Sequence, residues 1–442
     1  MNTKKSRFAR SALTALIVLT ASGCSVSHLS AGGSQAGTAA NTETTPAAPA
    51  QTSGAAVTAE VKPEPGASLT LWEEEVEFGF LKPAVKEFEE KYNVPVQIEH
   101  VPVPNQAQRL SNDGPAKLAA DVVLVPHDRL GDMASANLIL PNDVFEQDTR
   151  NTMLDTAVQA VTFNGILYGY PKSIETYALY YNKDLVKEPA KTWDQIAEFA
   201  KTFNDKSKNR YAVMWENRSM YYNYAFIGTN GGYVFGKNGT DPEDIGLNND
   251  GAVQAMKYFQ GLKSILPVNT ADTTYNVKTQ LFQEGKLAYN IDGPWSSGSF
   301  KGKVNFGVMP LPQLPGGKRS VSFSGVRAYY VNSYTKYPNA AKLFAKFLTD
   351  KENALNNFKT TGTIPANKEA GEDPIIQYDP IVSGFLEQFK ESQPMPSIPE
   401  MANVWAPMEG AIGAIWNDQA DVKTSLDKAV QTIKDQNKST KK

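Results

Sequence analysis

The feature that most restricts the fold of this chain is an alternation of short apolar runs with segments of helical periodicity. The run 68–72 (SLTLW) predicts a buried strand. The next segment, 80–92, places its apolar side chains on one helical face, and 94–101 alternates as a second strand. A strand, a helix and a strand in this order form a βαβ unit, which pairs its two strands in parallel.

The same alternation continues further along the chain. The run 121–126 (DVVLVP) is continuously apolar, as strands of parallel sheets are. Asn164-Gly165 predicts a hairpin turn, and Thr192 with Gln195 predicts a capping box at the start of a helix. Apolar residues at three- and four-residue spacing predict further helices at 251–265, 338–349 and 421–435. The fold class is therefore α/β, and the length of the chain favours two lobes.

The N-terminus has the layout of a secretory signal peptide. Four basic residues precede a short apolar run, 12–20, which is too short to span a bilayer as a stable helix. Small residues at 21–23 then precede Cys24, the only cysteine of the chain. One cysteine suits neither a disulfide-rich secreted domain nor a thiol-rich cytosolic enzyme. Ordinary signal cleavage beside an incidental cysteine is the alternative to a role as an anchor.

The residues around Cys24 resemble the lipobox of bacterial lipoproteins, with Ala21 where Leu is usual. The resemblance implies that the thiol is acylated and that Cys24 becomes the first residue after cleavage. Residues 24–66 are mostly Ala, Gly, Ser, Thr and Pro, so we expect a disordered tether. We therefore expect the protein on the outer face of the cytoplasmic membrane, held there by lipid alone. A tether of this length favours a Gram-positive cell.

Composition and motifs argue against several classes of function. Removal of the first 23 residues changes the formal charge from −3 to −7, which disfavours a nucleic-acid partner. The chain has three histidines and contains no HExxH, CxxC or GxSxG motif. We therefore expect no metal, no cofactor and no catalytic residue. A glycoside hydrolase needs only two carboxylates and stays an alternative.

Stretches spread over residues 69–436 resemble, in their order along the chain, the maltose/maltodextrin-binding group of ABC-transporter solute-binding proteins. The most specific ones are HDR at 127–129, YNKDL at 181–185, IDGPW at 291–295 and MPSIPEM at 395–401. The resemblance implies a type II-like periplasmic-binding-protein fold, in which two discontinuous lobes are joined by a hinge of three crossovers. Such proteins close on an oligosaccharide and present it to permease subunits. We therefore expect a monomeric binding protein that is not an enzyme.

The resemblance also implies how the chain is divided. The expected parts are a signal peptide at 1–23, a tether at 24–66, an N-terminal lobe at 67–176 and 326–372, and a C-terminal lobe at 177–325 and 373–442. The three crossings would lie near Glu175, Gly325 and Gly371.

A pyranose has apolar C–H faces and a rim of hydroxyls, so aromatic rings and charged groups recognise it together. The resemblance assigns hydroxyl binding to Asp128, Arg129 and Glu175, ring stacking to Tyr221, Trp295 and Trp405, and the far end of the site to Met395. We further expect Trp72 and Glu74, near the cleft edge of the first strand, to add to this site.

Each of these residues also has an ordinary structural interpretation. An adjacent Asp-Arg pair is often a solvated surface pair, an isolated Trp often packs in a core, and a lone Glu often caps a helix or forms an ion pair. The neighbouring Tyr222 and Tyr224 are assigned mostly to packing, with contact to the groove as the alternative for either. Tyrosine pairs also resemble the ligands of ferric-iron-binding relatives, although such sites usually want histidine or further acids. The alternatives are therefore another oligosaccharide, ferric iron or glycoside hydrolysis.

The sequence departs from the family at several positions. Val125 stands where enteric members carry a stacking Trp, and Val76 and Glu77 replace an Asp-Lys pair. Ser219 replaces a Glu beside the stacking tyrosine. A longer maltodextrin, or a cyclodextrin with no reducing end, would tolerate these losses better than maltose.

Replacement of Cys24 by serine tests the anchor. Because a serine at this position carries no thiol to acylate, we expect the C24S protein to appear in the culture medium, whereas the parent protein sediments with membranes. Fractionation followed by immunoblotting measures this. Retention of C24S in the membrane fraction would contradict the lipid anchor.

Overall fold

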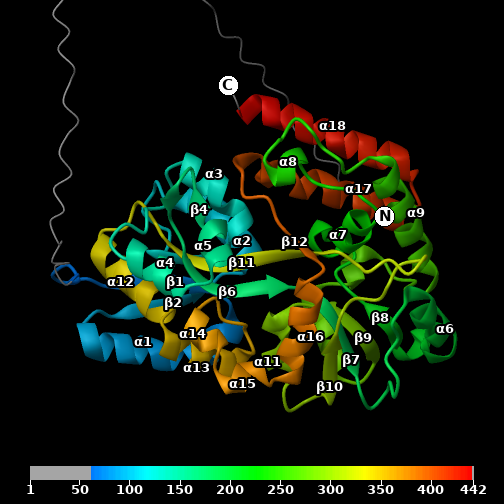
Figure 1. Ribbon diagram of the computed structural model, residues 1–442, viewed down its shortest axis with the longest axis horizontal. Helices are drawn as coiled ribbons and strands as arrows, with labels where there is room; N and C mark the ends of the chain where they lie inside the picture. Colours follow the sequence, from blue (N-terminus) through cyan, green and yellow to red (C-terminus); the bar gives the residue numbers. More distant parts are fainter. Residues whose placement is uncertain (1–60, 441–442) are drawn as a thin grey trace, which may run out of the picture. The chain divides into compact units, whose positions relative to one another are not determined.

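Two β-sheets organise the part of the chain that the structure, a computed structural model, describes: residues 61–440 (Figure 1). The first sheet has the order β12-β11-β3-β1-β2, with β6 also paired to β11. Its strands are β1 (Leu69–Glu73), β2 (Val96–His100), β3 (Val122–Pro126), β6 (Tyr170–Thr176), β11 (Ser322–Val331) and β12 (Ser392–Pro394). The second sheet has the order β10-β7-β9-β8. Its strands are β7 (Ala178–Asn182), β8 (Tyr211–Met214), β9 (Leu287–Asp292) and β10 (Phe306–Met309).

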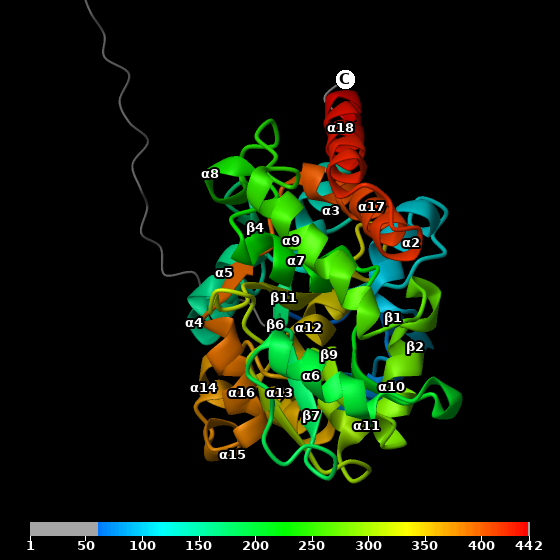
Figure 2. The same ribbon diagram turned by 90° about the vertical axis from the view of Figure 1, so that its right-hand side faces the viewer.

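Helices accompany both sheets, and Figure 2 shows them from a second side. Those beside the first sheet are α1 (Phe78–Tyr92), α2 (Val103–Asp113), α3 (Leu130–Ser135), α4 (Glu146–Thr152), α5 (Asp155–Ala160), α12 (Pro338–Leu348) and α13 (Lys351–Thr361). Those beside the second sheet, or packed on its helices, are α6 (Trp193–Phe203), α7 (Met220–Thr229), α9 (Asp250–Gly261), α10 (Tyr275–Gln283), α11 (Ser297–Phe300), α16 (Pro380–Phe389), α17 (Trp405–Asn417) and α18 (Val422–Thr440). The short helices α8 (Gly236–Gly239), α14 (Lys368–Gly371) and α15 (Pro374–Gln377) complete the set.

The predicted local elements are confirmed. Strand β1 pairs in parallel with β2 and with β3, and α1 is the helix of the first βαβ unit. The turn Asn164-Gly165 has φ angles of 49° and 81°, which a tight hairpin of this kind requires, and it joins β4 (Thr162–Phe163) to β5 (Ile166–Leu167). The hydroxyl of Thr192 accepts from the Gln195 backbone, and the Gln195 side chain accepts from the Thr192 backbone. The helices predicted in the last two hundred residues are α9, α12 and α18.

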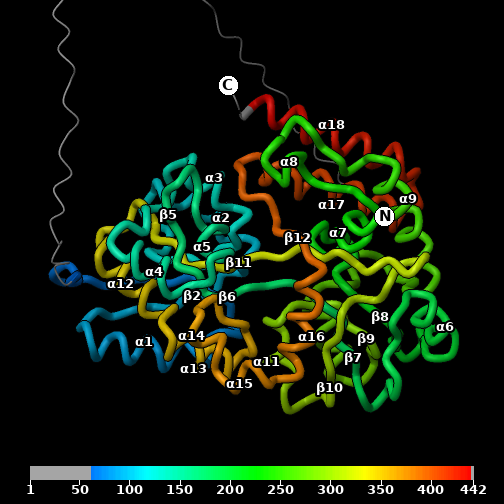
Figure 3. Tube along the Cα trace, in the orientation of Figure 1, coloured from blue at the N-terminus to red at the C-terminus, as the bar shows by residue number. Residues whose placement is uncertain are grey.

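Strand β11 makes the first sheet mixed. It runs antiparallel to β3 on one side and to β6 on the other, as the tube in Figure 3 allows the reader to trace. A single residue, Tyr177, separates β6 in the first sheet from β7 in the second. Its ring is fully buried, with centroids 4.9 Å from Tyr221 and 5.2 Å from Tyr222. The chain therefore passes between the sheets through a packed aromatic contact.

A buried ionic cluster joins strands β1, β6 and β11 of the first sheet. Lys172 Nζ lies 3.2 Å from Glu73 and 3.1 Å from Glu77, and the Tyr329 hydroxyl donates to Glu73 at 3.0 Å. All four side chains are buried. Burial raises the pKa of Glu73 to about 7, and the Lys172 ammonium opposes that rise. Glu77 is thus committed to an internal ion pair.

Several expectations concern residues outside the described part of the chain. These are the signal peptide at 1–23, Cys24 and most of the expected tether. Glu64, near the end of that segment, accepts hydrogen bonds from the backbone of Asn339 and Ala340 at the start of α12. Within residues 61–440, none of the helices combines the length and the apolar character needed to cross a membrane.

Candidate functional site

Most of the predicted site residues lie at the carboxyl ends of strands. Glu74 directly follows β1, Asp128 lies in the short turn after β3, and Trp295 lies in the turn after β9. Glu175 lies near the end of β6. Open α/β sheets bind ligands at the carboxyl ends of their strands, because side chains there are not needed for the core.

Four aromatic rings form a row, which we call the aromatic row: Trp295, Tyr221, Phe323 and Trp405. The Trp295 and Tyr221 centroids lie 6.4 Å apart. Tyr221 stacks on Phe323 at 6.2 Å, and Phe323 lies 6.4 Å from Trp405. The row joins the turn after β9, helix α7, strand β11 and the start of α17. Residues almost two hundred positions apart along the chain are therefore joined by consecutive ring contacts, in which Phe323 is fully covered.

The Trp295 end of the row carries two acids and one arginine. Arg327 Nε lies 2.9 Å from Glu175 Oε2, although this N–H is not aligned for a hydrogen bond, and Arg327 Nη1 lies 3.9 Å from Glu74. The guanidinium carbon lies 4.7 Å from the centroid of the Trp295 ring. Burial raises the pKa of Glu175, and the positive charge of Arg327 opposes that rise.

Gly293 explains how Trp295 reaches this position. The indole folds back on the glycine, so that a Cβ at Gly293 would fall 2.0 Å from the ring. The glycine of IDGPW is therefore a packing requirement of the tryptophan that follows it.

The Trp405 end of the row carries Asp128. The Trp405 side chain lies close enough to the Asp128 carboxyl to favour its ionised form. Burial raises the pKa of Asp128 to about 7, Arg129 opposes the rise, and Asp132 adds to it. The Arg129 guanidinium instead donates a hydrogen bond to the Asp132 carboxylate, with 2.6 Å between Arg129 Nη2 and Asp132 Oδ2. Asp128 therefore faces the aromatic row, while its neighbour forms a local ion pair.

A buried histidine ties this end of the site to strand β11. His127 Nδ1 accepts from the Val326 backbone at 3.2 Å, so Nε2 carries the proton and donates to the Met395 carbonyl at 3.0 Å. Burial lowers the pKa of His127 to about 4, so the ring is neutral at physiological pH. Met395 is itself buried. Its methyl group packs so closely on Gly325 that a Cβ added to this glycine would lie only 3.0 Å from Met395 Cε.

Trp72 and Glu74, the two expected site residues near the first strand, lie in different surroundings. Trp72 is fully buried, donates to Glu99 at 3.0 Å and has Arg109 over its ring, so the expectation that Trp72 adds to the site is wrong. Glu74 faces Arg327, but Glu74 Oε1 also accepts from the Val103 backbone at 3.1 Å. Core packs on both faces of β1, since Leu69 and Leu71 belong to one apolar cluster and Trp72 to the other, so Trp72 has no open face to offer a ligand.

The positions that depart from the family lie in different surroundings. Val125 is fully buried within β3, and Glu77 is buried against Lys172. Ser219 precedes the first residue of α7 and is half-buried. Neither Val125 nor Glu77 has an exposed surface with which to meet a ligand.

Sequence reasoning missed Phe323 and Arg327. Both lie in the apolar run of β11, where Phe323 looks like ordinary core. Arg327 did give a signal, because a charge inside an apolar strand needs a partner. The sequence could not identify that partner, which lies 152 positions away along the chain.

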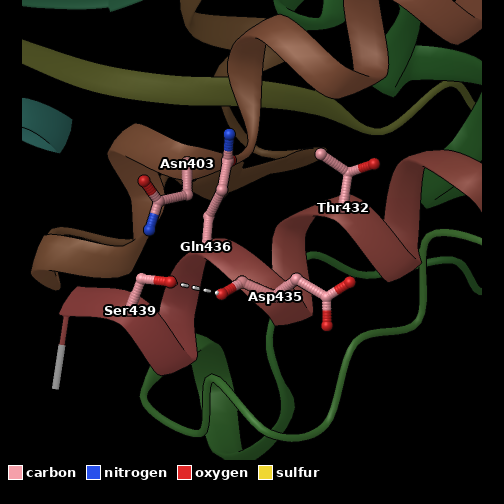
Figure 4. Close-up of a pocket in the computed structure, with 5 residues that line it drawn as sticks. All are labelled: Asn403, Thr432, Asp435, Gln436 and Ser439. Atoms are coloured by element: carbon pink, nitrogen blue, oxygen red, sulfur yellow. Dashed lines mark hydrogen bonds between the residues drawn. The ribbon is translucent and has the colours of Figure 1, made fainter. Parts of the chain in front are cut away.

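Two hollows lie away from these residues. One, of about 480 Å³, lies along α18 and is lined by Asn403, Thr432, Asp435, Gln436 and Ser439; Figure 4 shows Ser439 donating to the Asp435 carbonyl within the helix. The other, of about 710 Å³, lies at the loop 185–191 beside Phe199 and Tyr289. Neither is lined by a predicted site residue. Among residues 61–440, no group of three or more His, Cys, Asp or Glu side chains is arranged to hold a metal ion.

Comparison with known proteins gives a consistent set of relatives. Residues 83–384 match the family described as bacterial extracellular solute-binding protein. The galactooligosaccharide-binding protein of Bacillus subtilis is 34% identical over 84% of this chain and 90% of its own. The maltodextrin-binding protein MdxE of the same organism is 34% identical over 83% and 89%. A crystal structure of a cyclo/maltodextrin-binding protein complexed with maltotetraose is 36% identical, with a TM-score of 0.68 over 84% of this chain and 97% of that one.

The buried carboxyl of Asp128 predicts a pH-dependent stability. A folded pKa of about 7, against 3.8 as the ordinary value, means that the folded state keeps a proton that the unfolded state has lost. Stability should therefore fall as pH rises from about 4 to about 7, by at most about 4 kcal/mol. Asp128→Asn cannot ionise, so its melting temperature relative to the parent should be higher at pH 8 than at pH 5. A difference that is independent of pH would contradict this.

Proposed function

The chain belongs to the bacterial extracellular solute-binding proteins, and on that premise we propose that it binds malto-oligosaccharides outside the cell and delivers them to the permease of an ABC transporter. Relatives named for maltodextrin and maltooligosaccharide binding support the ligand class. We further propose that it acts as a monomer, without catalysis, held by a lipid on Cys24 at the outer face of a Gram-positive cell membrane. A relative described as a solute-binding lipoprotein supports the anchor.

The observation that carries this proposal is the aromatic row with charged groups at both ends. Trp295, Tyr221 and Trp405 offer flat apolar surface to successive sugar rings. Glu175 at one end and Asp128 at the other offer carboxylate oxygens to hydroxyls. An elongated arrangement of this kind suits a chain of several sugars better than a monosaccharide.

A galacto-oligosaccharide is the second candidate, because a relative of equal identity is named for that ligand. The two sugars have similar apolar faces and differ in the direction of hydroxyls and linkages. Calorimetry against glucose, maltose, maltotriose, longer maltodextrins, cyclodextrins and galacto-oligosaccharides separates them. A reducing-sugar assay after incubation with starch fragments tests the proposal that no hydrolysis occurs.

We propose that the protein opens and closes around its ligand. The lobes would be 67–176 with 326–372, and 177–325 with 373–442. Trp295 and Glu175 are only 8% and 7% exposed. A sugar can reach such covered surfaces only if the parts that cover them move apart, which a hinge of three crossovers permits.

Truncation of the tryptophans tests the aromatic row. Trp295→Ala and Trp405→Ala should each weaken maltodextrin binding by about 1–3 kcal/mol, or roughly tenfold to a hundredfold, since each removes a stacking face. Titration calorimetry measures the loss. Tyr378→Ala, which changes a side chain that is 85% exposed on the surface, is the matched control and should bind as the parent does. Unchanged affinity with a large fall in melting temperature would make these tryptophans core residues instead.

Small-angle scattering tests the hinge. Maltotriose or a longer glucan should reduce the radius of gyration of the parent, because the closed form alone lets both lobes contact the sugar. The double variant W295A/W405A at the same sugar concentration should show a smaller change. Identical curves for the parent with and without saturating sugar would mean that the cleft is rigid.

A further inference from the structure

Arg327 occupies an unusual place for a charged residue. It lies in the middle of β11, between Pro126 of β3 and Ser173 of β6, and its side chain is only 11% exposed. The pairing of β11 with β6 shifts register between Arg327 and Ala328. Such an irregularity re-aims a side chain relative to a regular strand.

The guanidinium contacts three groups from three elements. Glu175 belongs to β6 and Glu74 follows β1, so both acids come from the first sheet. Trp295 follows β9 of the second sheet, and its ring lies 4.7 Å from the guanidinium carbon. Arg327 thus joins an acid of one sheet to a ring of the other.

The chemistry of arginine suits these contacts. A planar guanidinium can lie on an aromatic face and offer its edge to carboxylates at the same time, whereas a lysine ammonium is a point charge that cannot do both equally well. The other buried cation of the first sheet provides a contrast. Lys172 lies against Glu73, Glu77 and Tyr329, and none of these three belongs to the aromatic row.

We infer that Arg327 is a positioning residue of the sugar site, which fixes the plane of the Trp295 ring and the direction of the Glu175 carboxylate. This inference rests on the proposed function, which supplies the sugar. In this role Arg327 raises the affinity of the Trp295 end of the aromatic row for a sugar. It does so through Trp295 and Glu175 and is not itself the main contact of the sugar.

The role has a consequence for pH dependence. The charged and titratable groups that face Glu175 are Arg327, Lys172, Glu74 and Tyr221, and of these Arg327 opposes the rise in the pKa of Glu175 most strongly. Without Arg327 the pKa of Glu175 should rise further. Glu175 would then be protonated at a higher pH than in the parent, and a protonated acid accepts fewer hydrogen bonds from hydroxyls.

The test compares Arg327→Met and Arg327→Lys with a matched control. Arg319→Met removes another arginine of a salt bridge, the exposed pair with Glu391, whose side chains are 67% and 36% exposed. Calorimetry with maltotetraose from pH 5 to pH 8 should show binding by R327M about tenfold weaker at pH 8, with a loss of affinity toward pH 5 that is steeper than the loss the parent shows through Asp128. R327K should be intermediate, and R319M should match the parent.

A second measurement needs no sugar. Acrylamide quenching of the Trp295 fluorescence, taken as the difference between each protein and its Trp295→Phe form, should be stronger in R327M than in the parent because the ring loses its cover.

If the parent binds neither maltodextrins nor galacto-oligosaccharides, the proposed function fails while quenching still tests the placement of Trp295. Parent-like affinity, pH profile and quenching in R327M would overturn the inference. So would a lower melting temperature with unchanged affinity and quenching.

Discussion

The pairing of β11 with two strands at once is the constraint on which the site depends. The backbone groups of a strand inside a sheet need partners on both edges, and β11 finds them in β3 and β6. This pairing brings residues near 325 beside those near 125 and 175. His127 then bonds the Val326 backbone, and Arg327 reaches Glu175. The same strand delivers Phe323 to the middle of the aromatic row.

Buried charge is used in two different ways beside this strand. Lys172 forms ion pairs with Glu73 and Glu77 within the first sheet, and none of these three side chains belongs to the aromatic row. Arg327 compensates acids at the end of the row and also lies on Trp295. Both arrangements obey the rule that a buried charge needs a partner, but only the second includes groups suited to a sugar. Burial of charge therefore does not by itself identify a binding site.

Much of the local structure could be predicted because it depends on neighbours in the sequence. The βαβ unit, the Asn164-Gly165 hairpin and the capping box of Thr192 all follow from periodicity or from side chains a few residues apart. Motif order identified the family and gathered a candidate site, in which burial raises the pKa of Tyr221 and the charges of Glu175 and Asp128 add to that rise. The expectation that Trp72 adds to the site was wrong, because core packs on both faces of β1 and because Glu99 and Arg109, which contact the indole, come from other elements of the finished fold.

The sequence by itself determined the secondary structure, the α/β class and the family, because short-range patterns and motif order suffice for these. Only the tertiary structure decided which charges meet: Glu77 with Lys172, and Arg327 with Glu175. The tertiary structure alone also placed the Phe323 ring in contact with both Tyr221 and Trp405. The physical reason is that ion pairing and ring stacking act over a few ångströms of space, whereas these partners lie about 80 to 150 residues apart along the chain.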